Sequence, residues 1–190
     1  MLNKIPVLDK GYVAQISCSL PREEFKNIQT RFFRGVLDDR LLQMPQLHIE
    51  IKCPLFVQLS FTETHLTALP LKGQKPEVYV PKVNEINARD LETSEMIQAD
   101  IERTADALLM NPKSYQMDGC DIFMSQTMAP IAIYNTLIVS GNLSQWISYV
   151  KRTDLPSPIE AYRQALTDII LAEWDFLWEL INGKKKERGK

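Results

Sequence analysis

Apolar and polar residues alternate most clearly in two stretches of the N-terminal half of the chain. Residues 11–18 predict a strand, with Val13 and Ile16 as candidate core residues. Residues 47–52 alternate strictly, which predicts a half-buried strand with all its apolar side chains on one face. That face would carry Leu47, Ile49 and Ile51, and the opposite face His48, Glu50 and Lys52.

Prolines and a glycine interrupt the chain after these strands. Pro54 is expected to interrupt the second strand, and another segment follows it. Residues 62–76 hold two prolines and a glycine, which predicts a loop, or a short helix followed by a loop. Residues 77–80 are a further short strand candidate.

Apolar residues at intervals of three and four predict helices elsewhere. The first helix would begin after a Ser19 cap and end at Gly35, and the second would span residues 94–109. The third would span residues 142–152, with Asn142 as its N-cap.

The last helix has the strongest pattern. It would begin at a capping box formed by residues 157–160, Ser-Pro-Ile-Glu, and end at Gly183. Its apolar face, over residues 158–181, is broader than one small domain readily covers, which favours packing against another subunit. Strands early in the chain and helices late predict an α+β domain.

The length and charge fit one domain with a short appendage. The 190 residues give a mass of 21.9 kDa, enough for a single domain over residues 1–183. The formal net charge is −2, but residues 184–190 hold five basic residues and one acid. This tail has three interpretations: a solubilising disordered end, a contact with nucleic-acid phosphates, or docking on the acidic body of a neighbouring subunit.

Several classes of chemistry have no signature in the sequence. The three cysteines are scattered and there are only two histidines, so no metal or disulfide is expected. Gly-rich phosphate-binding loops are absent from the sequence. No apolar run approaches the length of a membrane span, and a reducing cytoplasm is the expected compartment.

Three segments, in order, resemble the flavin-dependent thymidylate synthases. Residues 51–57, Ile-Lys-Cys-Pro-Leu-Phe-Val, are similar to the strand V-K-A-P-I-F-V of that family. Residues 77–81, Glu-Val-Tyr-Val-Pro, are similar to E-F-Y-I-P. The third segment, residues 119–163, matches the family's spacing of Gly, Ala-Arg, Leu-Pro, N-x-R and A-Q-x-E-I-R without a gap. The resemblance covers roughly residues 40–170.

The resemblance implies a mixed β-sheet flanked by long helices, assembled as a homotetramer with sites shared between subunits. It also implies binding of FAD and deoxyuridylate, with methylation or another modification of a nucleotide. By matched position, nucleotide-binding residues would be Arg163, Gln126 and Thr153, with Arg152 beside Thr153. Cofactor-binding residues would be Asn142, His65 and Ser144.

The family's signature residues are largely replaced. Its basic triplet falls on Glu63, Thr64 and His65, and its flavin-contacting histidine falls near Met44. Three of its arginines fall on Gln126, Ser144 and Thr153, and only Asn142 and Arg163 keep the residue type. Because guanidinium groups pair bidentately with phosphate, these losses remove anion-binding groups.

Two functional hypotheses follow from this pattern. The protein could be a diverged enzyme that binds a nucleotide, with or without FAD, in a remodelled site between subunits. It could instead be a binding or structural subunit that keeps the fold without catalysis. For three of these residues a purely structural role is the alternative to ligand binding. Asn142 could be an N-cap, His65 an exposed loop residue, and Arg163 the partner of Glu160 in an ion pair.

Overall fold

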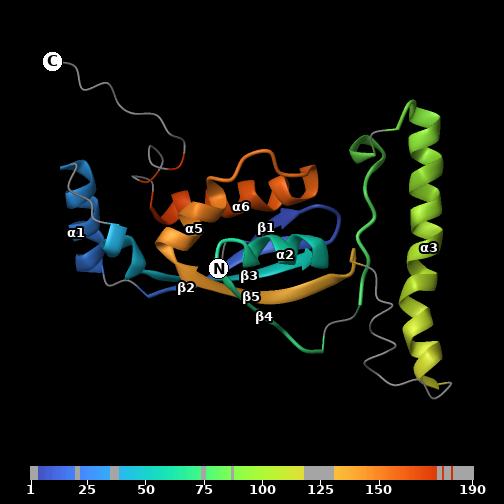
Figure 1. Ribbon diagram of the computed structural model, residues 1–190, viewed down its shortest axis with the longest axis horizontal. Helices are drawn as coiled ribbons and strands as arrows, with labels where there is room; N and C mark the ends of the chain where they lie inside the picture. The colour runs from blue at the N-terminus through green and yellow to red at the C-terminus, as the bar shows by residue number, and fades with distance from the viewer. Residues whose placement is uncertain are drawn as a thin grey trace.

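The computed structural model describes residues 4–19, 22–34, 39–73, 76–86, 88–117 and 131–174, together with Leu177 and Ile181. These residues form an α+β fold in which a five-stranded sheet, in the order β1-β2-β3-β5-β4, carries helices on one face (Figure 1). The predicted α+β class is therefore confirmed. Gln126, residues 184–190 and the end of the last predicted helix at Gly183 lie outside the described residues.

The sheet is antiparallel in every described pairing, so the expectation of a mixed sheet is wrong. A parallel neighbour would need a crossover from one end of the sheet to the other. The helices that follow β3 and β5 instead pack back on their own strands. The strands are β1 (Lys4–Val7), β2 (Gly11–Cys18), β3 (Gln46–Pro54), β4 (Thr67–Pro70) and β5 (Tyr134–Asn142).

Alternation places the core on one face of the sheet, as predicted for residues 47–52. Leu47, Ile49 and Ile51 are fully buried, and the intervening polar residues are half-buried on the other face. Val13 is also fully buried, but Ile16 is 38% exposed, contrary to the prediction. The register of β2 against β3 shifts between Gln15 and Ser17, and such a bulge breaks the alternation at the residue between them.

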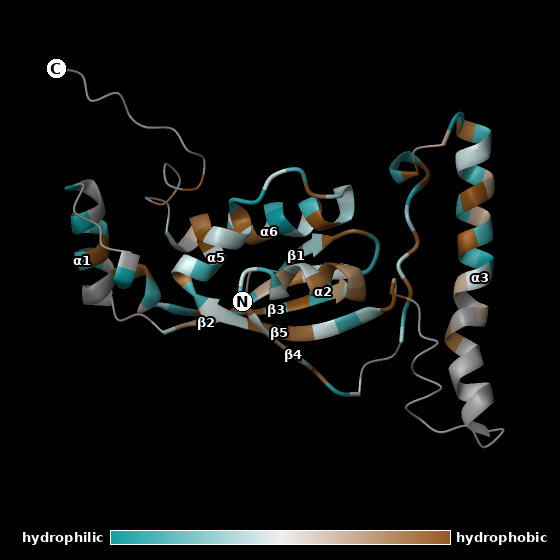
Figure 2. Cartoon of the chain, viewed as in Figure 1, coloured by the Kyte–Doolittle hydropathy of each residue, from teal (hydrophilic) through white to brown (hydrophobic). Residues whose placement is uncertain are grey.

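The described helices fall into two groups (Figure 1). Helices α2 (Leu55–Thr62), α5 (Leu143–Val150) and α6 (Ser157–Glu173) lie over the sheet, where hydrophobic positions concentrate (Figure 2). Helices α1 (Arg22–Phe33) and α3 (Leu91–Met117) lie at opposite ends of the molecule, and two short 3-10 helices, η1 (Asp39–Gln43) and η2 (Val83–Glu85), complete the structure. Among the described residues, no helix has a stretch long and apolar enough to cross a membrane.

Two elements arise that the sequence did not specify. The segment after Pro54 is helix α2, because Val57, Ser60 and Phe61 recur at helical spacing and are buried together. The predicted loop over residues 62–76 contains the edge strand β4. The strand candidate at residues 77–80 forms one isolated bridge, between Val78 and Ile133.

Helix α6 differs from its prediction at both ends. Pro156 is its N-cap and Glu160 bonds to Arg163, so the predicted capping box is wrong. The helix ends at Glu173, where Trp174 leaves the helical conformation. Its described apolar residues are mostly buried within this chain and do not by themselves indicate packing against another subunit; they include Tyr162, Leu166, Ile169 and Ile170.

Buried polar contacts fix the helices on the sheet. The Tyr162 hydroxyl of α6 donates to the carbonyl oxygen of Lys52 in β3 at 2.7 Å. The Trp146 indole N–H of α5 donates to the carbonyl oxygen of Leu47 at 3.2 Å, near the other end of β3. Tyr162 reaches the strand because Gly11 has no side chain. A Cβ there would meet the Tyr162 hydroxyl and lie 2.7 Å from the carbonyl oxygens of Lys52 and Val7.

We therefore expect Gly11→Ala to lower the free energy of unfolding by about 1–3 kcal/mol, since backbone atoms and a bonded hydroxyl must move. Urea denaturation followed by circular dichroism measures the change. Gly141→Ala is the matched control, because its Cβ meets side-chain atoms of Leu66 and Gln145, which can rotate away. Equal losses in the two variants would contradict the explanation.

Candidate functional site

Three of the predicted nucleotide-binding residues line one hollow. Arg152, Thr153 and Arg163 surround a cavity of about 490 Å³ beside the loop that joins α5 to α6, with Lys151 next to them. Arg152 and Thr153 follow the end of α5, and Arg163 projects from the second turn of α6. The structure thus places Arg163 beside Thr153 and Arg152, which lie ten and eleven positions earlier in the sequence.

Arg152 is held at the end of a neighbouring helix. Its Nη1 donates to the carbonyl oxygen of Ser60 at 3.0 Å, and its Nη2 lies 2.5 Å from a carboxylate oxygen of Glu63. Ser60 belongs to the last turn of α2, where carbonyl groups lack partners within the helix. A cation is favoured there because the helix dipole is negative at that end. The guanidinium also lies 5.9 Å from the centre of the Tyr149 ring.

Arg163 likewise bonds to a backbone carbonyl at the C-terminal end of a helix, in this case α5. Its Nη1 donates to the carbonyl oxygen of Val150, the last residue of α5, at 2.8 Å. Its Nε and Nη2 donate to the two carboxylate oxygens of Glu160 at 2.6 and 2.5 Å. This bidentate pair lowers the pKa of Glu160 and raises the pKa of Arg163. The ion pair with Glu160 is the plain structural role weighed for Arg163.

Basic residues outnumber acids in the lining of the hollow, while Glu63, which is not part of the lining, pairs with Arg152. The lining holds three basic residues, Lys151, Arg152 and Arg163, and two acids, Asp154 and Glu160. Basic side chains, Arg above all, are the groups that recognise phosphate and carboxylate.

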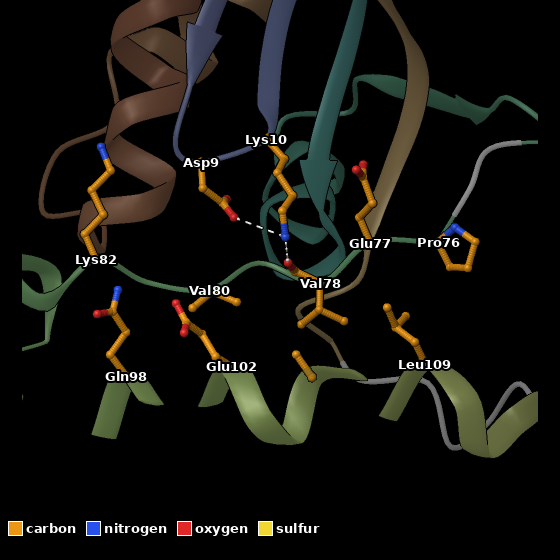
Figure 3. Close-up of a pocket in the computed structure, with 11 residues that line it drawn as sticks. Asp9, Lys10, Pro76, Glu77, Val78, Val80, Lys82, Gln98, Glu102 and Leu109 are labelled. Atoms are coloured by element: carbon orange, nitrogen blue, oxygen red, sulfur yellow. Dashed lines mark hydrogen bonds and ion pairs between the residues drawn. The ribbon is translucent and has the colours of Figure 1, made fainter. Parts of the chain in front are cut away.

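A larger cavity of about 610 Å³ lies between the segment at residues 76–82 and α3 (Figure 3). There Lys10 donates to the carbonyl oxygen of Val78 and lies 3.5 Å from Asp9. Its lining has two lysines, Lys10 and Lys82, and three acids, Asp9, Glu77 and Glu102. Its excess of acids makes it the poorer candidate for a phosphorylated ligand.

The predicted cofactor residues lie at the start of α5, away from the hollow. Asn142 is the N-cap: its side-chain oxygen accepts from the Gln145 N–H at 2.9 Å, and Gln145 Oε1 accepts from the Asn142 N–H at 2.8 Å. Gln145 also donates to the carbonyl oxygen of His65 at 2.8 Å. His65 is exposed, and Ser144 lies in the first turn of α5. Gln145 thus links Asn142 to the backbone of His65. The role of this arrangement is to cap the first turn of α5.

Among the described groups suited to covalent chemistry, Cys53 and Tyr149 are shielded, whereas Cys18 is half-buried. Cys53 is fully buried, and burial raises the pKa of its thiol. The Tyr149 hydroxyl lies 3.0 Å from Ser60 Oγ, and burial raises the pKa of this phenol to about 12. Nowhere in the described ranges do three His, Cys, Asp or Glu side chains gather as metal ligands would.

Sequence reasoning missed two residues of this region. Glu63 pairs with Arg152, although 89 positions separate them, and no local pattern signals such a contact. Gln145 forms the N-terminal cap of α5 with Asn142, and its position three residues after the cap is the signal that could have found it.

Comparisons with known proteins add no assignment: no protein-family profile matches the chain, and no curated protein matches it significantly.

We expect Asn142→Ala to lower the free energy of unfolding by about 1 kcal/mol, since the first turn of α5 loses its cap. Ser144→Ala is the matched control: Ser144 lies two residues further on, and its backbone oxygen, which accepts from Ser148, is unaffected. Thermal unfolding by circular dichroism compares the two variants. An equally stable Asn142→Ala would show that the cap is dispensable.

Proposed function

We propose that this protein is a diverged relative of the flavin-dependent thymidylate synthases that binds a phosphorylated, nucleotide-like small molecule. The hollow beside Arg152, Thr153 and Arg163 is the proposed site. The observation that supports the proposal is that Arg163 of α6 lines the same cavity as Thr153 and its neighbours Arg152 and Lys151. The fourth predicted residue, Gln126, lies outside the described part of the chain.

The arrangement of the resembling segments supports the relationship. Residues 51–54 belong to β3, which pairs with β5 over nine residue pairs. The segment at residues 77–81 meets the start of β5: the Tyr134 N–H donates to the carbonyl oxygen of Glu77 at 2.7 Å. The Leu55 N–H donates to the carbonyl oxygen of Ile133 at 3.0 Å. Three segments that are distant in sequence thus form one contiguous unit, as segments of a shared fold would.

The pairing of the arginines favours a role in binding without catalysis. Both guanidinium groups already bond to backbone carbonyls and to carboxylates. A nucleotide phosphate would bind to the donors that face the hollow, with Lys151 and Thr153 supplying further contacts from the loop. FAD binding and nucleotide methylation form the second candidate, which rests on the resemblance and on Asn142 keeping its residue type.

Calorimetric titration with deoxyuridine monophosphate tests the site. We expect binding to the wild-type protein and a loss of about fivefold in Lys151→Gln, whose exposed ammonium group faces the hollow. Lys82→Gln, at the other cavity, is the control with the same change of charge and should bind normally. Absence of binding to the wild type would refute the proposed function. The absorption spectrum of the purified protein tests the second candidate. The visible band of oxidised flavin would support FAD binding, and its absence would count against it.

The proposal includes self-association of this chain, because the family that it resembles forms its sites between subunits. Surface apolar residues are available for contact, including Leu91 and Met96 of α3, which are 68% and 61% exposed. We expect sedimentation velocity to show an oligomer, with a tetramer as the expected size. A single species of 21.9 kDa at micromolar concentration would contradict this part of the proposal.

A further inference from the structure

We propose that Pro70 blocks the free edge of the sheet, so that strand β4 of one copy of this chain cannot pair with β4 of a second copy. This blocking role concerns association between copies of the chain and is independent of the ligand proposed above.

Strand β4 is one edge of the sheet, with β5 as its neighbour in the described part of the chain (Figure 1). The Leu71 N–H donates to the carbonyl oxygen of Thr136 in β5 at 2.8 Å. Backbone groups of a strand point to alternate sides from one residue to the next. Those of Leu69 therefore also point toward β5, and those of Ala68 and Pro70 point away from it. Because proline has no N–H, Pro70 removes a donor from the free edge and costs no bond to β5.

Pro70 does not serve to end the pairing with β5. It lies opposite Leu137 in the register, and Leu71 after it still bonds to β5. A proline is tolerated inside a sheet where its missing N–H would face solvent. The other edge strand, β1, also has a proline in its interior, Pro6, whereas the interiors of β2, β3 and β5 have none. Within the strands, interior prolines thus occur at the two edges of the sheet.

The same edge continues beyond β4 and is covered there as well. The Tyr79 N–H donates to the carbonyl oxygen of Ala132 at 2.9 Å, so the preceding residue, Val78, faces away from the chain that leads into β5. The carbonyl oxygen of Val78 accepts a hydrogen bond from the Lys10 ammonium at 2.9 Å. A lysine on an exposed edge is another feature that discourages the addition of a strand.

Without Pro70, β4 would be complementary to itself. Antiparallel pairing about a two-fold axis at Leu69 sets residue 68 of one copy opposite residue 70 of the second, and the two Leu69 side chains opposite each other. Each pair of residues 68 and 70 would then exchange two N–H···O=C bonds. Leu69 is 59% exposed, so this pairing would also remove apolar surface from water.

Pro70 removes one hydrogen bond from each of these pairs. The carbonyl oxygen of Ala68 then has no N–H opposite it, and taking this oxygen out of water without a bond is unfavourable. The pyrrolidine ring also fills the space where the donor hydrogen would lie. A second copy is therefore excluded from this edge, and the oligomer proposed above must form through other surfaces.

The variant Pro70→Ala, which restores the N–H, tests the block. Sedimentation velocity at micromolar concentrations should show self-association at least about tenfold stronger than that of the wild type. Pro81→Ala is the matched control, because it makes the same change outside the strands and should sediment as the wild type does. The double variant Pro70→Ala/Ala68→Pro moves the proline to the other outward-facing position of β4, and it should also behave as the wild type does.

A disulfide tests where the copies meet. Leu69→Cys added to Pro70→Ala should give a disulfide-linked dimer on mild oxidation, because residues 69 of the two copies lie directly opposite each other. Leu69→Cys alone, with Pro70 in place, should not. Non-reducing gel electrophoresis compares the two proteins, with Pro70→Ala alone as the measure of any link through the native cysteines.

Three results would overturn the proposal. The first is a Pro70→Ala variant that sediments as the wild type does. The second is association of the double variant as strong as that of Pro70→Ala, which would show that the missing N–H is not the cause. The third is association without the disulfide, which would place the contact on another surface. If circular dichroism shows that Pro70→Ala is unfolded, Pro70→Thr supplies the same N–H with a residue favoured in strands, and the same results decide.

Discussion

The pairing of β3 with β5 is the constraint on which the rest of the structure depends. The two strands run antiparallel over nine residue pairs, from Gln46 opposite Asn142 to Pro54 opposite Tyr134. Each strand continues directly into a helix of eight residues that packs on the same sheet. Because the strands run in opposite directions, the two helices start at opposite ends of the sheet and extend toward each other. Each helix is about 12 Å long and each strand about 30 Å, so their C-terminal ends meet above the sheet.

This convergence explains why two arginines are found where they are. Two helix ends that meet bring together unpaired carbonyl groups and two negative dipole ends. Their contact is visible in the Phe61 and Tyr149 rings, whose centres are 5.0 Å apart. Arg152 and Arg163 supply the cations that this junction needs, and the exposed acids balance their charge. A structural requirement has thus created a charged cavity, lined by the same arginines that hold the helix ends.

Much of the fold follows from local sequence, but the site does not. The alternation of Leu47, Ile49 and Ile51 predicts both β3 and its buried face, and Asn142 predicts the start of α5. Predictions from local sequence fail where tertiary contacts override the local pattern. Glu160 fits a capping box but bonds to Arg163 instead, because a guanidinium group offers stronger hydrogen-bond donors than a backbone N–H. The bulge that exposes Ile16 depends on pairing with β3. The contact of Glu63 with Arg152 exists only because two helices converge, so no spacing in the sequence could indicate it.

The burial of Cys53 has a practical consequence for measuring motions of the sheet. This thiol lies in β3 beneath the helices, with its pKa raised by burial, so a thiol reagent reaches it only when the core opens. At a reagent concentration high enough for modification to outpace reclosing, its modification rate would therefore report how often β3 separates from its neighbours rather than how reactive the sulfur is. The Cys53 thiol is therefore a probe of transient unfolding at the central strand pair, and a ligand that stabilises the native state should lower its modification rate.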